Sequence, residues 1–312
     1  MGSSLLTNSA AMTALQTLRS VSSALQTTEN RISTGQRVST ASDNAAYWSI
    51  ATSMRSDNAA LSAISDSLGL SAATVDTEYT ALTTVIGDKN SGLTKLQSLL
   101  VEAKTAGIDR TKIQADITQI QQDMKLKANS ATFNGINWLS IDTSTSSTAT
   151  PTSFSLVSSY SRVGGTPTIG SITVTTATYA LYTVGGASKT GLLDALAGST
   201  APSVDTININ TIDDSAAKQT LLDGYIVQVT TAINSVASAA ANLGAVKNRI
   251  ATNTDFVKTL MDSVDRGVGQ LVDADMNAES TRLQALQTQQ QLGVQALSIA
   301  NQNSQSILSL FR

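Results

Sequence analysis

The sequence predicts a mainly α-helical fold, in which the two end regions form a long antiparallel coiled-coil bundle and a small β-rich outer domain is inserted between them. Apolar residues repeat with alternating spacings of four and three near both ends of the chain. The stretch between the ends, about residues 141–205, is rich in Ser and Thr and holds all three prolines. Aromatic residues are only 4% of the chain and charged residues 14%. That composition favours thin helices packed through small side chains over one thick core.

The first zone, residues 1–140, is expected to hold four helices. The first helix carries an apolar seam, interrupted at Gly35, that consists of Ala11, Leu15, Leu18, Ser22, Leu25, Glu29 and Ile32. A second helix should begin at the capping residues 41–44 and run past Leu70. A third should end near Gly107, and a fourth should contain Ile113–Met124. The Asn134-Gly135 pair that follows is typical of a tight hairpin turn.

The middle zone reads as short strands with glycine turns. Strands are expected at 153–157, 171–176 and 178–184, with turns at 164–165 and 185–186. A short helix is expected around residues 192–196. This zone should form the inserted domain.

The third zone has the strongest periodicity in the chain. The four-three spacing is unbroken through the set Leu222, Ile226, Val229, Ile233, Val236, Ala240, Leu243, Lys247, Ile250, Thr254, Val257, Met261, Val264, Val268 and Leu271. A helix of that length needs neighbours along its whole course. After Leu271 the register moves by one residue, just beyond Gly267 and Gly269, and we interpret this slip as a joint between two packing environments. Gly35 is the matching joint in the first zone.

The simplest arrangement folds the chain back so that its two outer segments meet. We expect a self-assembly seam made of Leu15, Leu18, Leu25, Ile32, Met276, Leu283, Leu286, Leu297, Ile307 and Phe311. A Gln-rich stretch, 284–291, places polar residues within the C-terminal part of this seam. Helices this marginal need partners, so we expect them to order only on assembly.

Two absent residue types exclude most catalytic chemistry. The chain has no histidine and no cysteine, which removes the Ser-His-Asp and Cys-His systems, thiolate sites and histidine-based zinc sites. A net charge of −3 gives no basic footprint for nucleic acid. The carboxylates of Asp273 and Asp275 are expected to lie in a solvated helix start. We predict a non-enzymatic protein with no cofactor and no metal site.

Several separate motifs stand out along the chain: ENRISTGQRV at 29–38, ASDNAA at 41–46, FNG at 133–135, NLGAVKNR at 242–249, QQQLG at 289–293 and ILSLFR at 307–312. Together they resemble the motifs of bacterial flagellins. Residues 44–50, NAAYWSI, look most like flagellins of the rhizobial, alphaproteobacterial type; in many others Gly stands where this chain has Tyr47. The resemblance covers both ends of the chain in the right order.

The resemblance implies a layered subunit of the flagellar filament, the propeller for swimming. Residues 1–46 and 269–312 would form the inner coiled coil with its connecting spoke. Residues 47–142 and 205–268 would form a helical shell with a β-hairpin near 133–139, and 143–204 a variable outer domain. The N-terminus lacks the charged and apolar regions of a secretory signal, so export would use the flagellar type III apparatus without a cleaved signal peptide and place the subunit outside the cell.

The resemblance also implies partners. The chain would polymerise with itself and with other flagellins, and would meet an export chaperone, a filament cap and hook-junction proteins, without nucleic acid or membrane. At 93–99 it reads LTKLQSL, where flagellins recognised by the vertebrate innate receptor carry two arginines, so weak receptor activation is expected. The alternatives are a hook–filament junction protein, a generic coiled-coil adhesin, and an enzyme-bearing flagellin, which would need the His-Glu-x-x-His motif that a histidine-free chain lacks.

Overall fold

The computed structural model describes residues 8–143, 151–163, 165–185, 189–195 and 202–310, with side chains up to residue 302. It divides into two compact units. Unit 1 consists of residues 1–59 and 261–312, and unit 2 of residues 60–260. Within the described ranges, no helix has both the length and the hydropathy needed to span a membrane.

Long helices dominate the described chain. They are α1 (Ser9–Thr34), α2 (Ala45–Ile86), α3 (Gly92–Glu102), α4 (Arg110–Ser130), α5 (Ala216–Val272) and α6 (Met276–Leu310). The strands are β1 (Ser140–Asp142), β2 (Ser153–Val163), β3 (Thr166–Thr175) and β4 (Tyr182–Val184). The mainly helical prediction is therefore confirmed, and α2 and α5 each contribute residues to both units.

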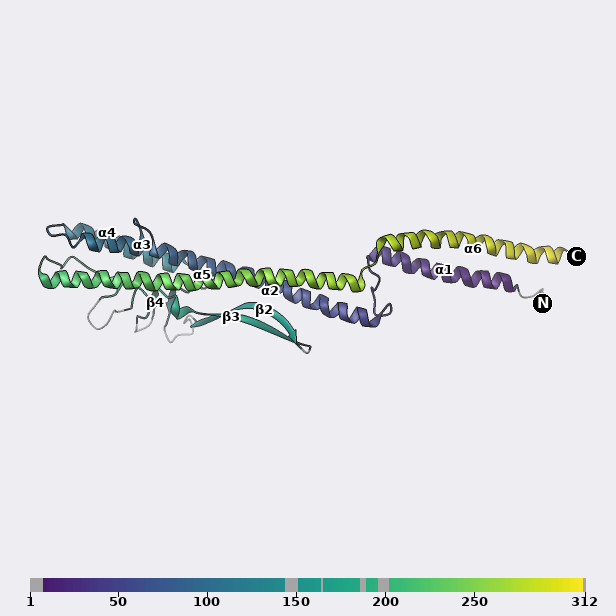
Figure 1. Ribbon diagram of the computed structural model, residues 1–312, viewed down its shortest axis with the longest axis horizontal. Helices are drawn as coiled ribbons and strands as arrows, with labels where there is room; N and C mark the ends of the chain where they lie inside the picture. The colour runs from purple at the N-terminus through teal and green to yellow at the C-terminus, as the bar shows by residue number, and fades with distance from the viewer. Residues whose placement is uncertain (1–7, 144–150, 164, 186–188, 196–201, 311–312) are drawn as a thin grey trace. The chain divides into compact units, whose positions relative to one another are not determined.

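Unit 1 is built on the antiparallel pair of α1 and α6, which lie side by side (Figure 1). Asn8, at the start of α1, donates from its side chain to the carbonyl of Ala300, near the end of α6 (2.9 Å). Arg31, near the end of α1, donates to the carboxylate of Glu279, in the first turn of α6 (2.9 Å). The pairing of the two outer segments is thus observed.

Unit 2 packs α3, α4 and the remainder of α2 and α5 around an apolar core. The fully buried side chains include Leu61, Leu68, Leu82, Leu93, Leu96, Leu100, Ile117, Met124, Leu222, Val229 and Leu243. The long seam expected for α5 is confirmed, because every member except Lys247 is buried or half-buried. Burial of such side chains contributes about 1.5–3 kcal/mol each, which stabilises helices that contain many small polar residues.

Lys247 fills the one exposed position of that seam, and its contacts explain why a charge is tolerated there. Its ammonium pairs with the carboxylate of Asp76 on α2 (2.6 Å) and lies 5.8 Å from the centre of the Tyr79 ring. Gly244, one turn earlier, packs against the same ring. A polar residue in an apolar seam is a known device for fixing the register of two helices.

Tight turns in unit 2 use residues with positive φ. Gly87 and Gly92 approach one another between α2 and α3, and a Cβ on Gly92 would lie 2.3 Å from the carbonyl oxygen of Val85. Asn134 and Gly135 have φ of 51° and 77°, and Phe133 and Ile136 exchange both backbone hydrogen bonds (2.9 Å each). The predicted Asn-Gly turn is confirmed as a type I′ turn.

The inserted segment forms two separate two-stranded sheets. β2 and β3 make a long antiparallel hairpin, and β1 pairs with β4 in parallel. Residues 192–194 form a turn where a short helix was expected. An extra residue in β2, between Val157 and Ser159, shifts the register, so Tyr160 and Ile169 pair on the face opposite to the buried Ile172.

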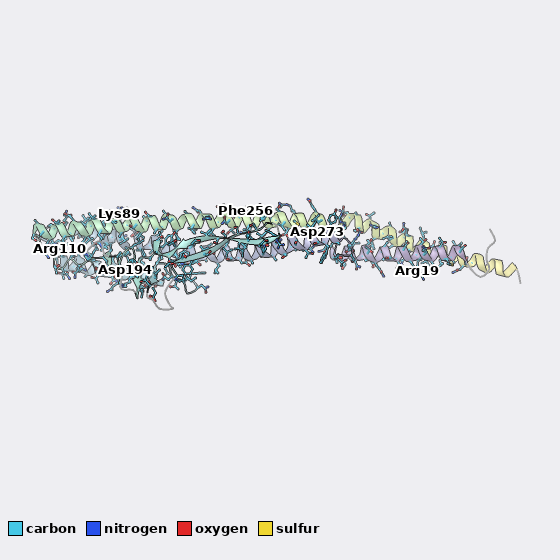
Figure 2. The ribbon with its side chains drawn as sticks, turned by 90° about the horizontal axis from the view of Figure 1, so that it is seen from below. Arg19, Lys89, Arg110, Asp194, Phe256 and Asp273 are labelled. Atoms are coloured by element: carbon cyan, nitrogen blue, oxygen red, sulfur yellow. The ribbon has the colours of Figure 1, made fainter. Side chains whose placement is uncertain are left out.

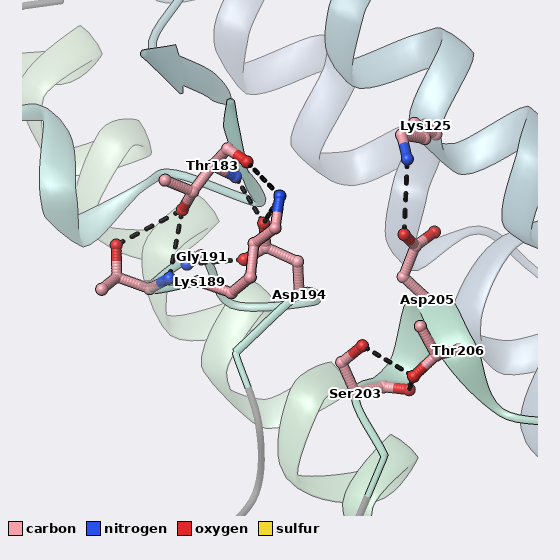
Figure 3. Close-up of polar contacts among 9 residues, drawn as sticks. Lys125, Thr183, Lys189, Gly191, Asp194, Ser203, Asp205 and Thr206 are labelled. Carbon is pink, nitrogen blue, oxygen red and sulfur yellow. Dashed lines mark hydrogen bonds and ion pairs between the residues drawn. The ribbon is translucent and has the colours of Figure 1, made fainter. Parts of the chain in front are cut away.

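The insertion is fastened to the helices rather than separate from them. Figure 3 shows Asp194 accepting hydrogen bonds from the backbone N–H groups of Thr183 (2.6 Å) and Gly191 (2.8 Å). It also shows Lys125 of α4 reaching Asp205 (3.5 Å). These residues all belong to unit 2. A third, independent outer domain does not emerge as a compact unit, and the three-layer boundaries expected above remain a prediction.

Candidate self-association site

The two ends of the pair between α1 and α6 are fixed by polar contacts. Asn8 caps α1 by accepting from the N–H of Ala11 (3.0 Å) while it bonds Ala300 across the pair. At the opposite end, Glu279 is only 8% exposed, so its ion pair with Arg31 lies in a largely dehydrated setting. A partly buried, charge-assisted bond of this kind sets orientation and register.

The contact that α1 makes with α6 overlaps only in part with the predicted self-assembly seam. Leu18, Leu25 and Ile32 are half-buried, as expected. Leu15, however, is 38% exposed, and the most buried residues are Val21 and Thr28. Two heptad phases share the 18-25-32 positions, and the structure uses the phase that alternates them with 21 and 28. The sequence favours the other phase because that phase contains the large apolar side chain of Leu15.

The seam of α6 follows the predicted spacing more closely. Leu286 is buried, and Leu283 and Leu297 are half-buried. Gly293 keeps that spacing because its missing side chain makes room for Leu18, whose Cδ1 would lie 3.3 Å from a Cβ there.

The remaining predicted seam residues of the C-terminal segment are Met276, Ile307 and Phe311. Met276, the first residue of α6, is 45% exposed. Ile307 belongs to the helix, but its side chain lies outside the description, as does Phe311 altogether.

Gly35, the first of the predicted joint residues, coincides with a helix end, and its role as a joint stays a prediction. Gly35 ends α1 in the left-handed conformation (φ 69°), which favours glycine. The following backbone pairs with the segment after α5, because Arg37 donates to Val272 (2.6 Å) and Ala274 donates to Gly35 (2.9 Å). A small apolar cluster of Val38, Ala51, Val268 and Val272 lies beside this pairing.

The second joint lies later than expected. α5 continues through Gly267 and Gly269 and ends at Val272; the interruption falls at 273–275, where Figure 2 labels Asp273. Gly267 instead provides close packing, since a Cβ there would lie 3.0 Å from the terminal methyl of Met54. A glycine inside a long packed helix costs only about 1 kcal/mol, so the tertiary contacts hold the helix intact.

Aspartates in unit 1 shape the backbone. Asp43 accepts from the backbone N–H groups and the hydroxyls of Ser39 and Thr40, and these bonds lower the pKa of Asp43, the backbone bond from Thr40 first. Asp275 accepts from the N–H groups of Asn277 and Ala278, which caps α6 as the helix-start interpretation predicted. No group of three or more acidic side chains within the described ranges is placed to hold a metal ion.

Unit 1 also presents apolar side chains that its own chain leaves uncovered. Those more than a third exposed are Met12, Leu15, Tyr47, Trp48, Ile50, Met276, Leu292, Val294 and Ile299. They lie on α1, on the start of α2 and on α6. Exposed apolar residues gathered on paired helices are typical of a surface that further helices cover.

Comparisons with known proteins agree with this arrangement. The bacterial flagellin N-terminal helical region matches residues 5–143, and the bacterial flagellin C-terminal helical region matches residues 226–311. The chain is 45% identical to Flagellin C of Rhizobium meliloti (strain 1021) over 326 residues, covering 99% of both chains.

Two further relatives have the same coverage of this chain. A flagellin of Brucella melitensis biotype 1 is 45% identical over 310 residues, covering 99% of both chains. Flagellin A of Rhizobium meliloti (strain 1021) is 39% identical over 404 residues, covering 99% of this chain and all of that one. The two matched helical regions contain all six helices except the start of α5, and on these grounds the chain belongs to the bacterial flagellin family.

Proposed function

We propose that the pair of α1 and α6 is the part of this subunit that joins neighbouring copies in the flagellar filament. As a flagellin, the chain is a structural, non-enzymatic subunit of that filament. The proposal rests on one observation: α1 and α6 are paired antiparallel, yet both keep large apolar side chains exposed, among them Leu292 and Ile299 on α6. In the polymer, helices of adjacent copies would cover these side chains. The hook–filament junction alternative is not favoured, because the relatives matched over their full length are flagellins.

The first test removes the C-terminal helix. A chain lacking residues 278–312 should remain monomeric under conditions where the full chain forms sedimentable filaments visible by electron microscopy. The deletion removes the partner of α1 together with most of the exposed apolar side chains of α6. Normal filaments from the truncated chain would contradict the proposal.

A milder test leaves the pair intact. Replacing Leu292 and Ile299 with Ser removes side chains that are already 58% and 62% exposed in the single chain. The critical concentration for polymerisation should rise roughly 10-fold or more, because apolar contacts at the centre of an interface dominate its energy. Leu126→Ser on α4, at 65% exposure, is the matched control and should polymerise more nearly like the wild type.

Assembly is expected to order the chain ends. The α1–α6 seam has the polar Gln290 at one position and Gly293, which buries no side chain, at another, so we infer that the isolated pair is marginal and that the polymer stabilises it. Circular dichroism should show helix content rising on polymerisation. An unchanged helical signal would count against coupled folding and assembly.

Other partners are part of the proposal, which family membership and the exposed apolar side chains of α6 support. We infer export through the flagellar type III apparatus without a cleaved signal, a chaperone that covers α6 before export, a distal cap, contacts with hook-junction proteins at the filament base, and copolymerisation with other flagellins. A pull-down with the separate α6 segment would test the chaperone contact.

Weak activation of the vertebrate innate receptor is a further proposal. Lys95 and Gln97 stand where recognised flagellins carry arginines, and the Gln97 amide is bonded to the hydroxyl of Thr230 on α5 (2.8 Å). Neither side chain offers the planar, bidentate fork of arginine. A reporter-cell assay with purified monomer should give a weak response, which Lys95→Arg with Gln97→Arg should increase. A full response from the wild type would refute this proposal.

A further inference from the structure

Glu78 is a completely buried acid where α2 meets the inserted segment. Its side chain is 0% exposed, and its Oε1 accepts the backbone N–H of Trp138 at 2.8 Å. Trp138 is itself 1% exposed and comes two residues before β1. A single carboxyl group of the helix therefore holds the chain at the point where it enters the strands.

The hydrogen bonding of this carboxyl group is incomplete. Among the described residues, neither the second oxygen of Glu78 nor the indole nitrogen of Trp138 has a hydrogen-bond partner, and both are buried. An ionised carboxylate can accept about four hydrogen bonds, and this one accepts one. A buried charge with so few partners is costly, whereas the neutral acid is tolerated far better.

No lysine or arginine in the described part of the chain forms an ion pair with Glu78. Asp76 and Tyr79 flank it on α2; Lys247, facing from α5, is engaged with both of them. On the strand side the titratable groups are Asp142 of β1 and Tyr182 of β4, and the ammonium of Lys125 lies 5.9 Å from the centre of the Tyr182 ring. Burial raises the pKa of Glu78 to about 8, and the bond from the Trp138 N–H opposes this increase.

Trp138 connects this acid to both sheets. Its ring lies 5.9 Å from that of Phe154 on β2, centre to centre, and its chain continues into β1, which pairs with β4. We propose that Glu78 is a proton-sensitive anchor of the inserted segment: the neutral acid holds Trp138 on α2, and ionisation loosens the segment around it.

The test uses Trp138 as its own reporter. The chain contains two tryptophans, so Trp48→Phe in the full-length protein leaves Trp138 alone. Quenching of its fluorescence by acrylamide should be weak at pH 6 and several-fold stronger at pH 9, because the carboxyl ionises between these values while tyrosines stay neutral. Adding Glu78→Gln, which keeps an acceptor but cannot ionise, should keep quenching weak throughout.

The controls separate this acid from others. Glu102→Gln, at an exposed position of α3, should leave the pH response unchanged. Glu78→Met, which removes the acid while filling its space, should also abolish the response, and it substitutes for Glu78→Gln if that variant folds poorly. Equal quenching of the Trp138-only protein at pH 6 and pH 9, or a full response in both Glu78 variants, would overturn the proposal.

Discussion

Gly92 and Gly107 show two different reasons for a glycine in unit 2. Both have positive φ, 65° and 78°. Only Gly92 also lies against other backbone, where a Cβ would meet the carbonyl oxygen of Val85; around Gly107 there is open space. At Gly107 an added side chain would therefore cause only the backbone strain of a positive φ. At Gly92 it would cause that strain and also a clash with neighbouring backbone atoms.

Comparing the two alanine variants should separate these effects. Gly107→Ala is expected to cost about 1 kcal/mol of unfolding free energy from backbone strain. Gly92→Ala should cost roughly 3 kcal/mol or more, because α2 and α3 must also move apart. Urea unfolding of both variants measures the difference, and equal costs would show that the close approach is unimportant.

The stability of unit 2 should fall as pH rises, because of Glu78. Its pKa is about 8 in the folded chain against an ordinary value of 4.5. Its favourable effect is therefore fully present below pH 4.5 and is lost progressively as pH rises to about 8. The loss is of order 3–5 kcal/mol. Glu78→Gln should flatten this part of the stability–pH curve, and a wild-type curve that rises between pH 5 and pH 8 would contradict the assignment.

Helix α5 was predictable from sequence because its seam is long, apolar and unambiguous. Helix α1 was harder: two phases share Leu18, Leu25 and Ile32, and the phase that the structure uses buries Thr28, a polar residue that periodicity ranks low. The ion pair of Arg31 with Glu279 could not be predicted either, because no local sequence pattern indicates it. A partner 248 residues away becomes visible only once the two helices are paired.

The Arg31–Glu279 pair should matter more than an exposed ion pair. Arg31→Ala leaves the Glu279 carboxylate buried without a cation, and its second oxygen already lacks a partner within the described residues. The critical concentration for polymerisation should rise roughly 10- to 100-fold. Replacing both residues with apolar ones, Arg31→Met with Glu279→Leu, should recover most of that loss. If the double variant is as defective as the single one, the cost does not come from an unpaired charge.

At the scale of the molecule, helix content and the back-folding of the ends were predictable, whereas the division into units was not. A change in composition near residue 141 suggested a domain boundary. The contacts of Asp205 with Lys125, and of Trp138 with Phe154, cross that boundary and keep the insertion within unit 2. A change in composition marks where the residue types change, and the side-chain contacts across it show that the insertion packs with residues of unit 2.

Shortening the β2–β3 hairpin in two ways should show whether its base or its tip contributes to the stability of unit 2. Replacing 158–170 with Asn-Gly keeps the pair of Val157 with Ser171, and most of the described residues that it removes are exposed, so the thermal midpoint should change little. Replacing 151–176 also removes Phe154 and the buried Ile172 and Val174, and should cost roughly 3 kcal/mol, or about 6–12 °C. Equal midpoints for the two variants would mean that the insertion is dispensable to unit 2.

The bond from Asn8 to Ala300 joins positions 292 residues apart. Synthesis proceeds from the N-terminus, so α1 is made first, and its partner is complete only when nearly the last residues have been added. A prematurely terminated chain has no means of closing unit 1, however well its unit 2 folds. Because the pairing helices lie at opposite ends, unit 1 can close only in a complete chain, and a truncated chain is left without the helix pair that we propose joins neighbouring copies.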